Sequence, residues 1–224
     1  ELGLAGAGCA LIERGAQWPT HRELKIPEPP IFVDADMHSP STPEPRTPLV
    51  MVHGWGGDRH SFDALAPLLQ NDRPVLVVDL PGHGKSLAPT GMEGNAAHSV
   101  SAYAEAIAAK MDEFELTAAI LIGHSNGAPV SREFARLFPD RCSGIVSLDG
   151  SMVKLMGKDA ADQFVGALTS TNSRDVLQGM MDGMLPADMG KTHRQNLVRA
   201  TLQADLNVLI ASARAVLHDQ PWPE

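Results

Sequence analysis

The chain has 224 residues, of which 43% are hydrophobic and 20% charged, and its formal net charge is −9. These values fit a globular protein with one α/β domain and room for an added lobe, and the negative charge disfavours binding to nucleic-acid phosphates. No apolar run approaches the ~20 residues that a membrane-spanning helix needs. The two cysteines, Cys9 and Cys142, form neither a disulfide framework nor a metal-binding pattern. We therefore expect reduced thiols, a cytoplasmic protein, no metal and no cofactor.

Residues 20–48 are rich in proline. Proline has no backbone N–H to donate to a sheet, so any strand in this region lies at a sheet edge. The pattern predicts one irregular edge strand within residues 22–36 and a surface loop over residues 37–48.

Four short apolar runs follow, at residues 49–52, 75–78, 118–122 and 144–148. They are continuous rather than alternating, which indicates strands buried on both faces, as in a parallel sheet. Helical patterns separate them, at residues 62–69 (with Ser61 as the expected N-cap), 100–114 and 128–138. Strands that alternate with helices predict a three-layer α/β domain with a mostly parallel sheet and flanking helices.

A glycine-rich loop, His53-Gly54-Trp55-Gly56-Gly57, follows the first apolar run. In open α/β sheets, ligands bind beyond the carboxyl ends of the strands, where this loop is expected to lie. Gly54 allows a close approach of the chain, which leaves the Trp55 N–H free to donate a hydrogen bond into the cleft. An ordinary glycine-rich turn is the alternative.

The second apolar run leads into Asp79-Leu80-Pro81-Gly82-His83-Gly84-Lys85-Ser86. The last three residues resemble the end of a P-loop, but Asp79 stands where a P-loop requires glycine. We therefore reject nucleotide binding at this loop. The histidines of the chain also lack the spacing of a metal site.

The third apolar run leads into Gly123-His124-Ser125-Asn126-Gly127. A strand, a sharp turn and a helix around G-x-S-x-G are typical of a nucleophile elbow, in which glycine at both flanks avoids clashes at a strained turn. A chance match in a loop is the alternative, but the position after a buried strand favours the elbow. Ser125 is the candidate nucleophile, and the Asn126 N–H is a second donor beside that of Trp55. His124 and Gly54 complete the candidate substrate-binding residues.

Residues 151–221 contain no buried-strand run and are rich in methionine. Apolar residues recur at spacings of three and four over residues 194–217, which predicts a helix. We interpret the segment as a helical lid over the sheet, in which flexible thioethers suit an adaptable apolar pocket. Methionine as ordinary helix packing is an equal alternative. The predicted domains are thus a core at residues 1–150 and a lid at residues 151–221.

Three motifs in this order, at residues 53–57, 78–86 and 123–127, resemble the α/β-hydrolase superfamily, and more narrowly its lid-bearing esterases, lipases and C–C-bond hydrolases. The resemblance spans roughly residues 48–150. It implies that Ser125 is the nucleophile, that Trp55 and Asn126 donate backbone N–H groups to an oxyanion, and that the loop 79–86 is structural. A serine rather than an aspartate nucleophile disfavours the haloalkane dehalogenase and epoxide hydrolase branches.

The base and the acid of a catalytic triad are harder to place. In this fold the chain order is Ser, then an acid, then His, and only His193 and His218 follow Ser125. Both lie in the helical part, so we expect a truncated chain. Asp149 is a tentative acid at the end of the fourth apolar run, although a turn at Asp149-Gly150 is the favoured alternative. In such a fragment, we expect residues 144–148 to form an unpaired edge and the product to be poorly soluble and inactive.

The sequence thus predicts a serine hydrolase that attacks a small apolar ester, lactone or similar carbonyl substrate and forms an acyl-enzyme. Two alternatives remain open: a non-catalytic ligand-binding protein on the same scaffold, and an inactive fragment that lacks the base histidine. A lyase or perhydrolase that uses the same serine also fits, because a fold does not fix the reaction.

Overall fold

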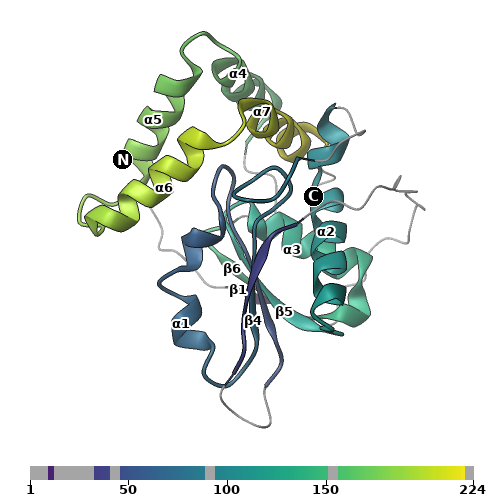
Figure 1. Cartoon of the computed structure of the whole chain (residues 1–224). Helices are drawn as coiled ribbons and strands as arrows, with labels where there is room; N and C mark the ends of the chain where they lie inside the picture. Colours follow the sequence, from purple (N-terminus) through teal and green to yellow (C-terminus); the bar gives the residue numbers. More distant parts are fainter. Residues whose placement is uncertain (1–9, 13–32, 41–45, 89–93, 151–155, 220–224) are drawn as a thin grey trace.

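The computed structural model describes residues 10–12, 33–40, 46–88, 94–150 and 156–219, and its centre is a six-stranded sheet in the order β1-β6-β5-β3-β4-β2 (Figure 1). The strands are β1 Ala10–Ile12, β2 Ala35–His38, β3 Leu49–Val52, β4 Val75–Val78, β5 Ala119–His124 and β6 Cys142–Leu148. The four strands β4, β3, β5 and β6 are mutually parallel, whereas β2 and β1 pair antiparallel at the two edges. Every residue of β3 and β4 is buried. The mostly parallel sheet predicted from continuous apolar runs is confirmed.

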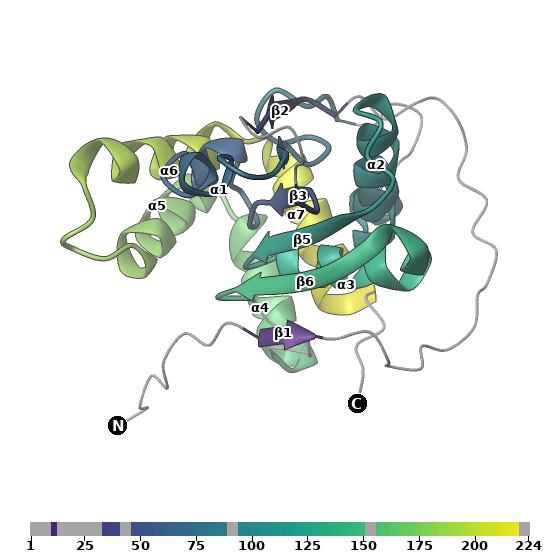
Figure 2. The same cartoon turned by 90° about the horizontal axis from the view of Figure 1, so that it is seen from below.

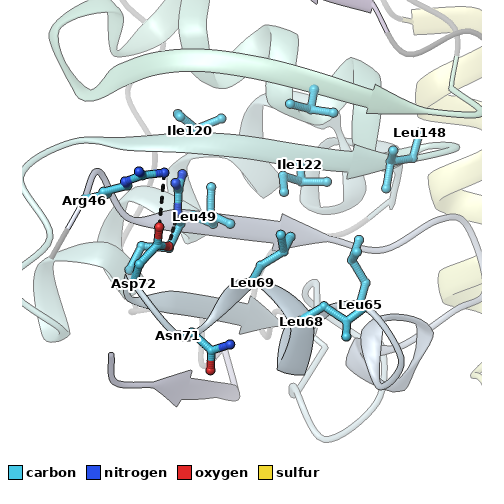
Figure 3. Close-up of a pocket in the computed structure, with 12 residues that line it drawn as sticks. Arg46, Leu49, Leu65, Leu68, Leu69, Asn71, Asp72, Ile120, Ile122 and Leu148 are labelled. Atoms are coloured by element: carbon cyan, nitrogen blue, oxygen red, sulfur yellow. Dashed lines mark hydrogen bonds and ion pairs between the residues drawn. The ribbon is translucent and has the colours of Figure 1, made fainter. Parts of the chain in front are cut away.

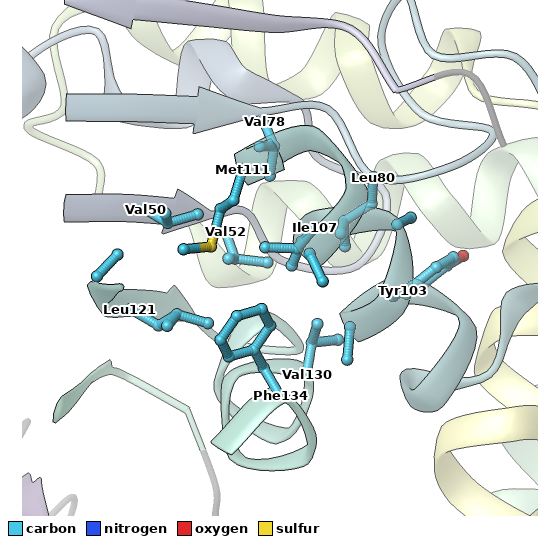
Figure 4. Close-up of a cluster of buried hydrophobic side chains, with 14 of the residues drawn as sticks. Val50, Val52, Val78, Leu80, Tyr103, Ile107, Met111, Leu121, Val130 and Phe134 are labelled. Atoms are coloured by element: carbon cyan, nitrogen blue, oxygen red, sulfur yellow. The ribbon is translucent and has the colours of Figure 1, made fainter. Parts of the chain in front are cut away.

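One face of the sheet is covered by two helices, α2 Val100–Glu113 and α3 Gly127–Leu137, which also pack on each other (Figure 2). The largest hydrophobic core lies beneath them, and Figure 4 shows Ile107 and Met111 of α2 meeting Phe134 of α3 over the strands. The Ser99 side chain caps α2 by accepting a hydrogen bond from the Ala102 N–H. This layer confirms the helices predicted from two of the sequence patterns.

On the opposite face, the described part of the chain places two four-residue helices, α1 Ala66–Leu69, which contacts β4, and η1 Arg59–Phe62, whose Phe62 lies in the same small core. Beside α1 lies a depression of about 700 Å³ (Figure 3). Its apolar lining comes from the strands and from the segment around α1: Leu49, Leu65, Leu68, Leu69, Ile120, Ile122, Val146 and Leu148. The two faces of the sheet are therefore covered to very different extents.

The chain after β6 forms four helices, α4 Lys158–Leu168, α5 Ser173–Met184, α6 Lys191–Gln203 and α7 Leu206–Arg214, and a last π-helical turn, η4 Ala215–Asp219. They gather beyond one end of the sheet (Figure 1) around a small core of their own that contains Val165, Leu168, Leu177, Leu209 and Ala213. We refer to residues 156–219 as the helical segment. Among the described helices, none combines the length and the hydropathy required to cross a bilayer.

Two local predictions about helices are wrong. Ser61 is not an N-cap: the short helix η1 Arg59–Phe62 begins earlier, because the Asp58 side chain accepts a hydrogen bond from the His60 N–H. The single helix predicted over residues 194–217 is instead split into α6 and α7. The Asp205 side chain accepts a hydrogen bond from the Asn207 N–H at 2.8 Å and starts a new helix there.

The predictions for the sheet edges also need correction. β6 is not an open edge, because Ala10, Leu11 and Ile12 pair with Ser147, Val146 and Ile145. The edge strand predicted within residues 22–36 appears as β2, further along the chain and reaching into the predicted loop. Residues 13–32, like Cys9 and residues 151–155, lie outside the described residues. The remaining connections are the short helices η2 Gly94–His98 and η3 Pro139–Arg141.

Candidate active site

Ser125 lies at the tip of the turn between β5 and α3, with its backbone in the left-handed region at a φ of 49°. Residues other than glycine rarely adopt this conformation, because Cβ crowds the neighbouring backbone. Two hydrogen bonds hold the turn: the Ser125 N–H donates to the Leu148 carbonyl at 3.0 Å, and the Ala128 N–H donates to the Ser125 carbonyl at 3.0 Å. The strained turn expected from the G-x-S-x-G spacing is present.

The two glycines of this turn are required by close contacts between backbone segments. A Cβ on Gly123 would lie 2.3 Å from the Gly127 carbonyl oxygen, and a Cβ on Gly127 would lie 2.1 Å from the Val52 carbonyl oxygen. Neither distance leaves room for a carbon atom. The start of α3 thus lies directly against the end of β3, and this contact sets how close the loop after β3 comes to Ser125.

The loop at residues 53–57 meets the turn at Gly54. A Cβ at this position would lie 3.0 Å from Ser125 Cβ and 3.1 Å from His124 Nδ1, so the close approach predicted for Gly54 is present. The loop closes on itself through a hydrogen bond from the Gly57 N–H to the Gly54 carbonyl, at 3.0 Å.

His53 anchors this loop to the loop after β4. Its Nε2 accepts a hydrogen bond from the Leu80 N–H at 3.0 Å, so the proton is on Nδ1, which donates to the Gly54 carbonyl at 2.8 Å. Complete burial, and to a lesser extent the neighbouring His124, lower the pKa of His53 to about 4. The ring is therefore neutral at pH 7 and serves as a fixed bridge.

The two backbone donors expected beside Ser125 have no partner in the described part of the chain. Neither the Trp55 N–H nor the Asn126 N–H donates a hydrogen bond to a described residue. Asn126 immediately precedes α3, where the first N–H groups of a helix point outward without intrahelical partners. Its side-chain Oδ1 is also buried and has no hydrogen-bond partner among these residues. Among the described residues, both amides therefore lack a hydrogen-bond partner.

Asp79 organises the loop after β4. Its carboxylate accepts hydrogen bonds from the Arg59 N–H at 2.7 Å and the Lys85 N–H at 2.9 Å, and the Arg59 guanidinium lies 3.3 Å away. The same guanidinium pairs with Asp34 and Asp36, which places four charged side chains in one cluster. Asp79 and Arg59 are 1% and 4% exposed. The two N–H hydrogen bonds fix the backbone at Arg59 and Lys85, and the ion pairs keep the Asp79 carboxylate in position.

Asp149 lies next to the turn at the end of β6, with a φ of 48° and an exposed side chain. The turn contacts this segment closely, since a Cβ on Gly150 would lie 2.6 Å from the Ser125 carbonyl oxygen. Burial lowers the pKa of His124, and the negative charge of Asp149 partly opposes this shift. Asp149 is thus close enough to influence the site, whereas its role as the acid stays a prediction.

Among the described residues, no histidine is hydrogen-bonded to Ser125 and able to act as its base. His193 lies in α6, and His218 lies at the end of the helical segment, where its Nε2 is 3.5 Å from an Asp162 carboxylate oxygen. No hydrogen bond joins Ser125 Oγ to a described histidine or carboxylate. Within the same residues, no group of three His, Cys, Asp or Glu side chains could hold a metal ion.

Sequence reasoning missed two features of this region. The first is the pairing of the buried Arg59 with Asp79, which was not predicted. A signal for it was present: Arg59 follows a glycine-rich loop, and Asp79 follows a buried strand. For Trp55 the sequence analysis predicted a role for the backbone N–H alone, whereas the indole of its side chain contacts the helical segment. That contact is between residues far apart in the chain, and no local pattern reveals it.

Comparison with known proteins gives an independent view of the chain. A family model described as the alpha/beta hydrolase fold matches residues 47–188. The dihydrolipoyllysine-residue acetyltransferase component of an acetoin cleaving system from Pseudomonas putida is 33% identical over 151 residues, which cover 67% of this chain and 38% of that protein. A pimeloyl-[acyl-carrier protein] methyl ester esterase from Neisseria meningitidis is 33% identical over 147 residues, which cover 62% of this chain and 53% of the esterase.

The chain therefore spans roughly half of the length of these relatives, or less. Among solved structures, an esterase from Exiguobacterium antarcticum superposes with a TM-score of 0.70 at 19% identity, over 83% of this chain and 69% of that one. At this identity, the similarity shows a shared architecture and says nothing of the substrate.

Proposed function

The chain belongs to the α/β-hydrolase fold family, and we propose that it acts as a serine hydrolase on an ester, a lactone or a similar carbonyl substrate, through an acyl-enzyme. The observation that carries the proposal is the strained backbone of Ser125 at the tip of a strand-to-helix turn. The Trp55 and Asn126 amides, which have no hydrogen-bond partner among the described residues, support it. A structure keeps such strain where a function requires it. The esterases among its relatives agree with this reaction class.

The proposed first step is attack of Ser125 Oγ on the substrate carbonyl carbon. The carbonyl oxygen becomes negative as the tetrahedral intermediate forms, and the N–H groups of Trp55 and Asn126 stabilise it by hydrogen bonds. Removing one such donor in a serine protease costs about 3 kcal/mol of transition-state stabilisation. The base takes the Ser125 hydroxyl proton during the attack and passes it to the alkoxide leaving group, which departs as the alcohol. Water, deprotonated by the same base, then hydrolyses the acyl-enzyme to release the acid and free Ser125.

Serine is a weak nucleophile and needs a base. Asp149 is the tentative acid of the triad, since it ends β6 close to the turn. In this fold the base histidine follows the acid in the chain. We propose that the base belongs to a part of the protein outside the described residues.

A non-catalytic ligand-binding protein on the same scaffold is the second candidate. The specific observation in its favour is that no described histidine side chain is hydrogen-bonded to Ser125 Oγ. In that case the two amides would bind a carbonyl or carboxylate oxygen of a ligand without turnover.

The test compares hydrolysis of p-nitrophenyl butyrate by the protein encoded by the complete gene and by its Ser125→Ala variant. We expect ester hydrolysis by the wild type and a loss of at least about a thousandfold in kcat for the variant, as for other serine hydrolases. Saturable binding of the ester without turnover would favour the second candidate. Equal turnover by both proteins would contradict the proposed nucleophile.

A further inference from the structure

Trp55 connects the loop 53–57 to the helical segment. Its backbone lies in the loop 53–57 beside Ser125, whereas its side chain packs against the core of the helical segment. The indole Nε1 donates a hydrogen bond to the Leu209 carbonyl of α7 at 3.0 Å. The ring also meets Phe164 of α4 edge to face, with ring centroids 5.5 Å apart and an interplanar angle of 62°. A single side chain therefore joins the loop to two helices.

The next residue shows that the loop backbone also lies against the helical segment. Gly56 has a φ of 69°, a conformation that suits glycine. A Cβ here would lie 3.2 Å from Thr201 Cγ2 of α6 and 3.6 Å from Leu209 Cδ2 of α7. The loop is thus fitted between the turn at Ser125 and the helices, with little space on either side.

The acceptor of the indole hydrogen bond is itself held in place from the sheet side. The Ser212 hydroxyl of α7 donates a hydrogen bond to the Leu209 carbonyl at 3.2 Å and lies near the buried Tyr103 of α2. Val208 of α7 lies against Gly82, where a Cβ would be only 2.8 Å from its methyl group. Since α7 is tied to the core at these points, the Leu209 carbonyl offers the indole a fixed position.

We propose that Trp55 is a positioning residue, whose indole links the docking of the helical segment to the backbone N–H that stabilises the oxyanion. The inference rests on the proposed function. Apart from the indole, the described hydrogen bonds of the loop come only from its two ends, through His53 and the Gly57 N–H. Loss of the indole bond leaves the middle of the loop freer to move, and an oxyanion donor acts only at the correct position. The helical segment then affects the rate of the reaction as well as the choice of substrate.

The test uses Trp55→Phe, which keeps an aromatic ring next to Phe164 but removes the N–H. Leu177→Val is the matched control, because Leu177 lies in the same helical core and carries no polar group. Hydrogen–deuterium exchange at the amides of residues 54–57 is the first measurement. The second is the split between kcat and KM for p-nitrophenyl butyrate, which a merely structural role would not change. Thermal unfolding of both variants shows whether the overall loss of stability is comparable.

We expect Trp55→Phe to increase amide exchange in the loop about tenfold and to lower kcat about tenfold, with KM nearly unchanged. A tenfold change is the effect expected from the loss of one hydrogen bond. Leu177→Val should leave loop exchange and kcat within about twofold of the wild type. Unchanged exchange in Trp55→Phe, or increased exchange with unchanged kcat, would overturn the proposal. If the wild type hydrolyses no ester, both the proposed function and the oxyanion role of Trp55 are wrong. The exchange data still decide whether the Trp55 indole links the loop to the helical segment.

Discussion

The turn at Ser125 and the helical segment respond to side-chain volume in opposite ways. At the turn, the nearest backbone atom would lie 2.3 Å from a Cβ on Gly123 and 2.1 Å from a Cβ on Gly127, so both positions require glycine. In the helical segment, Gly157, Gly166, Gly179, Gly183 and Gly190 have no atom within 4 Å of such a Cβ. The geometry next to the serine is therefore fixed by the backbone, whereas the helices over it tolerate change.

The largest effect that would sharpen this comparison is expected from Gly127→Ala. The new methyl group would lie 2.1 Å from the Val52 carbonyl oxygen, and backbone atoms cannot move away without separating α3 from β3. We expect a loss of about 4 kcal/mol in the free energy of unfolding, or failure to fold. Urea denaturation measures it, and a loss below about 1 kcal/mol would show that the turn is not tightly packed.

Asp79→Asn should have the next largest effect. It keeps the shape of the side chain but removes the negative charge beside the buried Arg59, and one oxygen that accepts a backbone N–H is replaced by an NH₂ group. Arg59 keeps its ion pairs with Asp34 and Asp36, so the main cost is the buried backbone N–H that loses its acceptor, about 2 kcal/mol. Chemical denaturation of this variant and of Asp63→Asn, an exposed control, provides the measurement. Similar stability of the two variants would mean that the cluster does not hold the loop.

Acid should weaken the part of the protein next to the turn before carboxylates are titrated. Burial lowers the pKa of His53 to about 4 and that of His83 to about 3, in both cases from an ordinary 6.5. Below pH 6.5 these two histidines bind protons in the unfolded chain but not in the folded protein. The free energy of unfolding therefore keeps their full contribution above pH 6.5 and decreases as the pH drops toward 4. Each histidine contributes about 1.4 kcal/mol per pH unit in that window. A free energy of unfolding that stays constant between pH 7 and pH 5 would contradict the neutral, buried state of both rings.

Gly179→Ala in α5 should have the smallest effect, and one of opposite sign. The position is in the interior of a helix, with open space around it. Alanine forms helix more readily than glycine, so we expect a gain of up to about 1 kcal/mol in the free energy of unfolding. The same glycine-to-alanine change would then destabilise the turn and stabilise the helical segment. A clear loss of stability for Gly179→Ala would end this contrast.

Much of the sheet and of the turn could be predicted from the sequence, because short-range patterns determine them. Continuous apolar runs gave the buried strands β3, β4, β5 and β6, and the spacing of Gly123 and Gly127 around Ser125 gave the turn. The break between α6 and α7 was missed because the apolar spacing continues across Asp205, whose capping role depends on the backbone around it.

Contacts between residues far apart in the chain could not be predicted in this way. The pairing of β1 with β6 joins the first described residues to a strand more than a hundred residues later, and no turn sequence signals it. The bond from the Trp55 indole to the Leu209 carbonyl spans a similar separation. Such contacts depend on how the elements are assembled, and therefore only the assembled structure shows them.

The central proposal is that Ser125 is a nucleophile beside the Trp55 and Asn126 amides, which have no hydrogen-bond partner among the described residues. The most direct test is to treat the protein encoded by the complete gene with a fluorophosphonate and to locate the adduct by peptide mass spectrometry, with Ser125→Ala as the control. The account predicts a single adduct on Ser125 that is absent from the variant. An adduct on another residue, or no adduct in a folded wild-type protein, would contradict it.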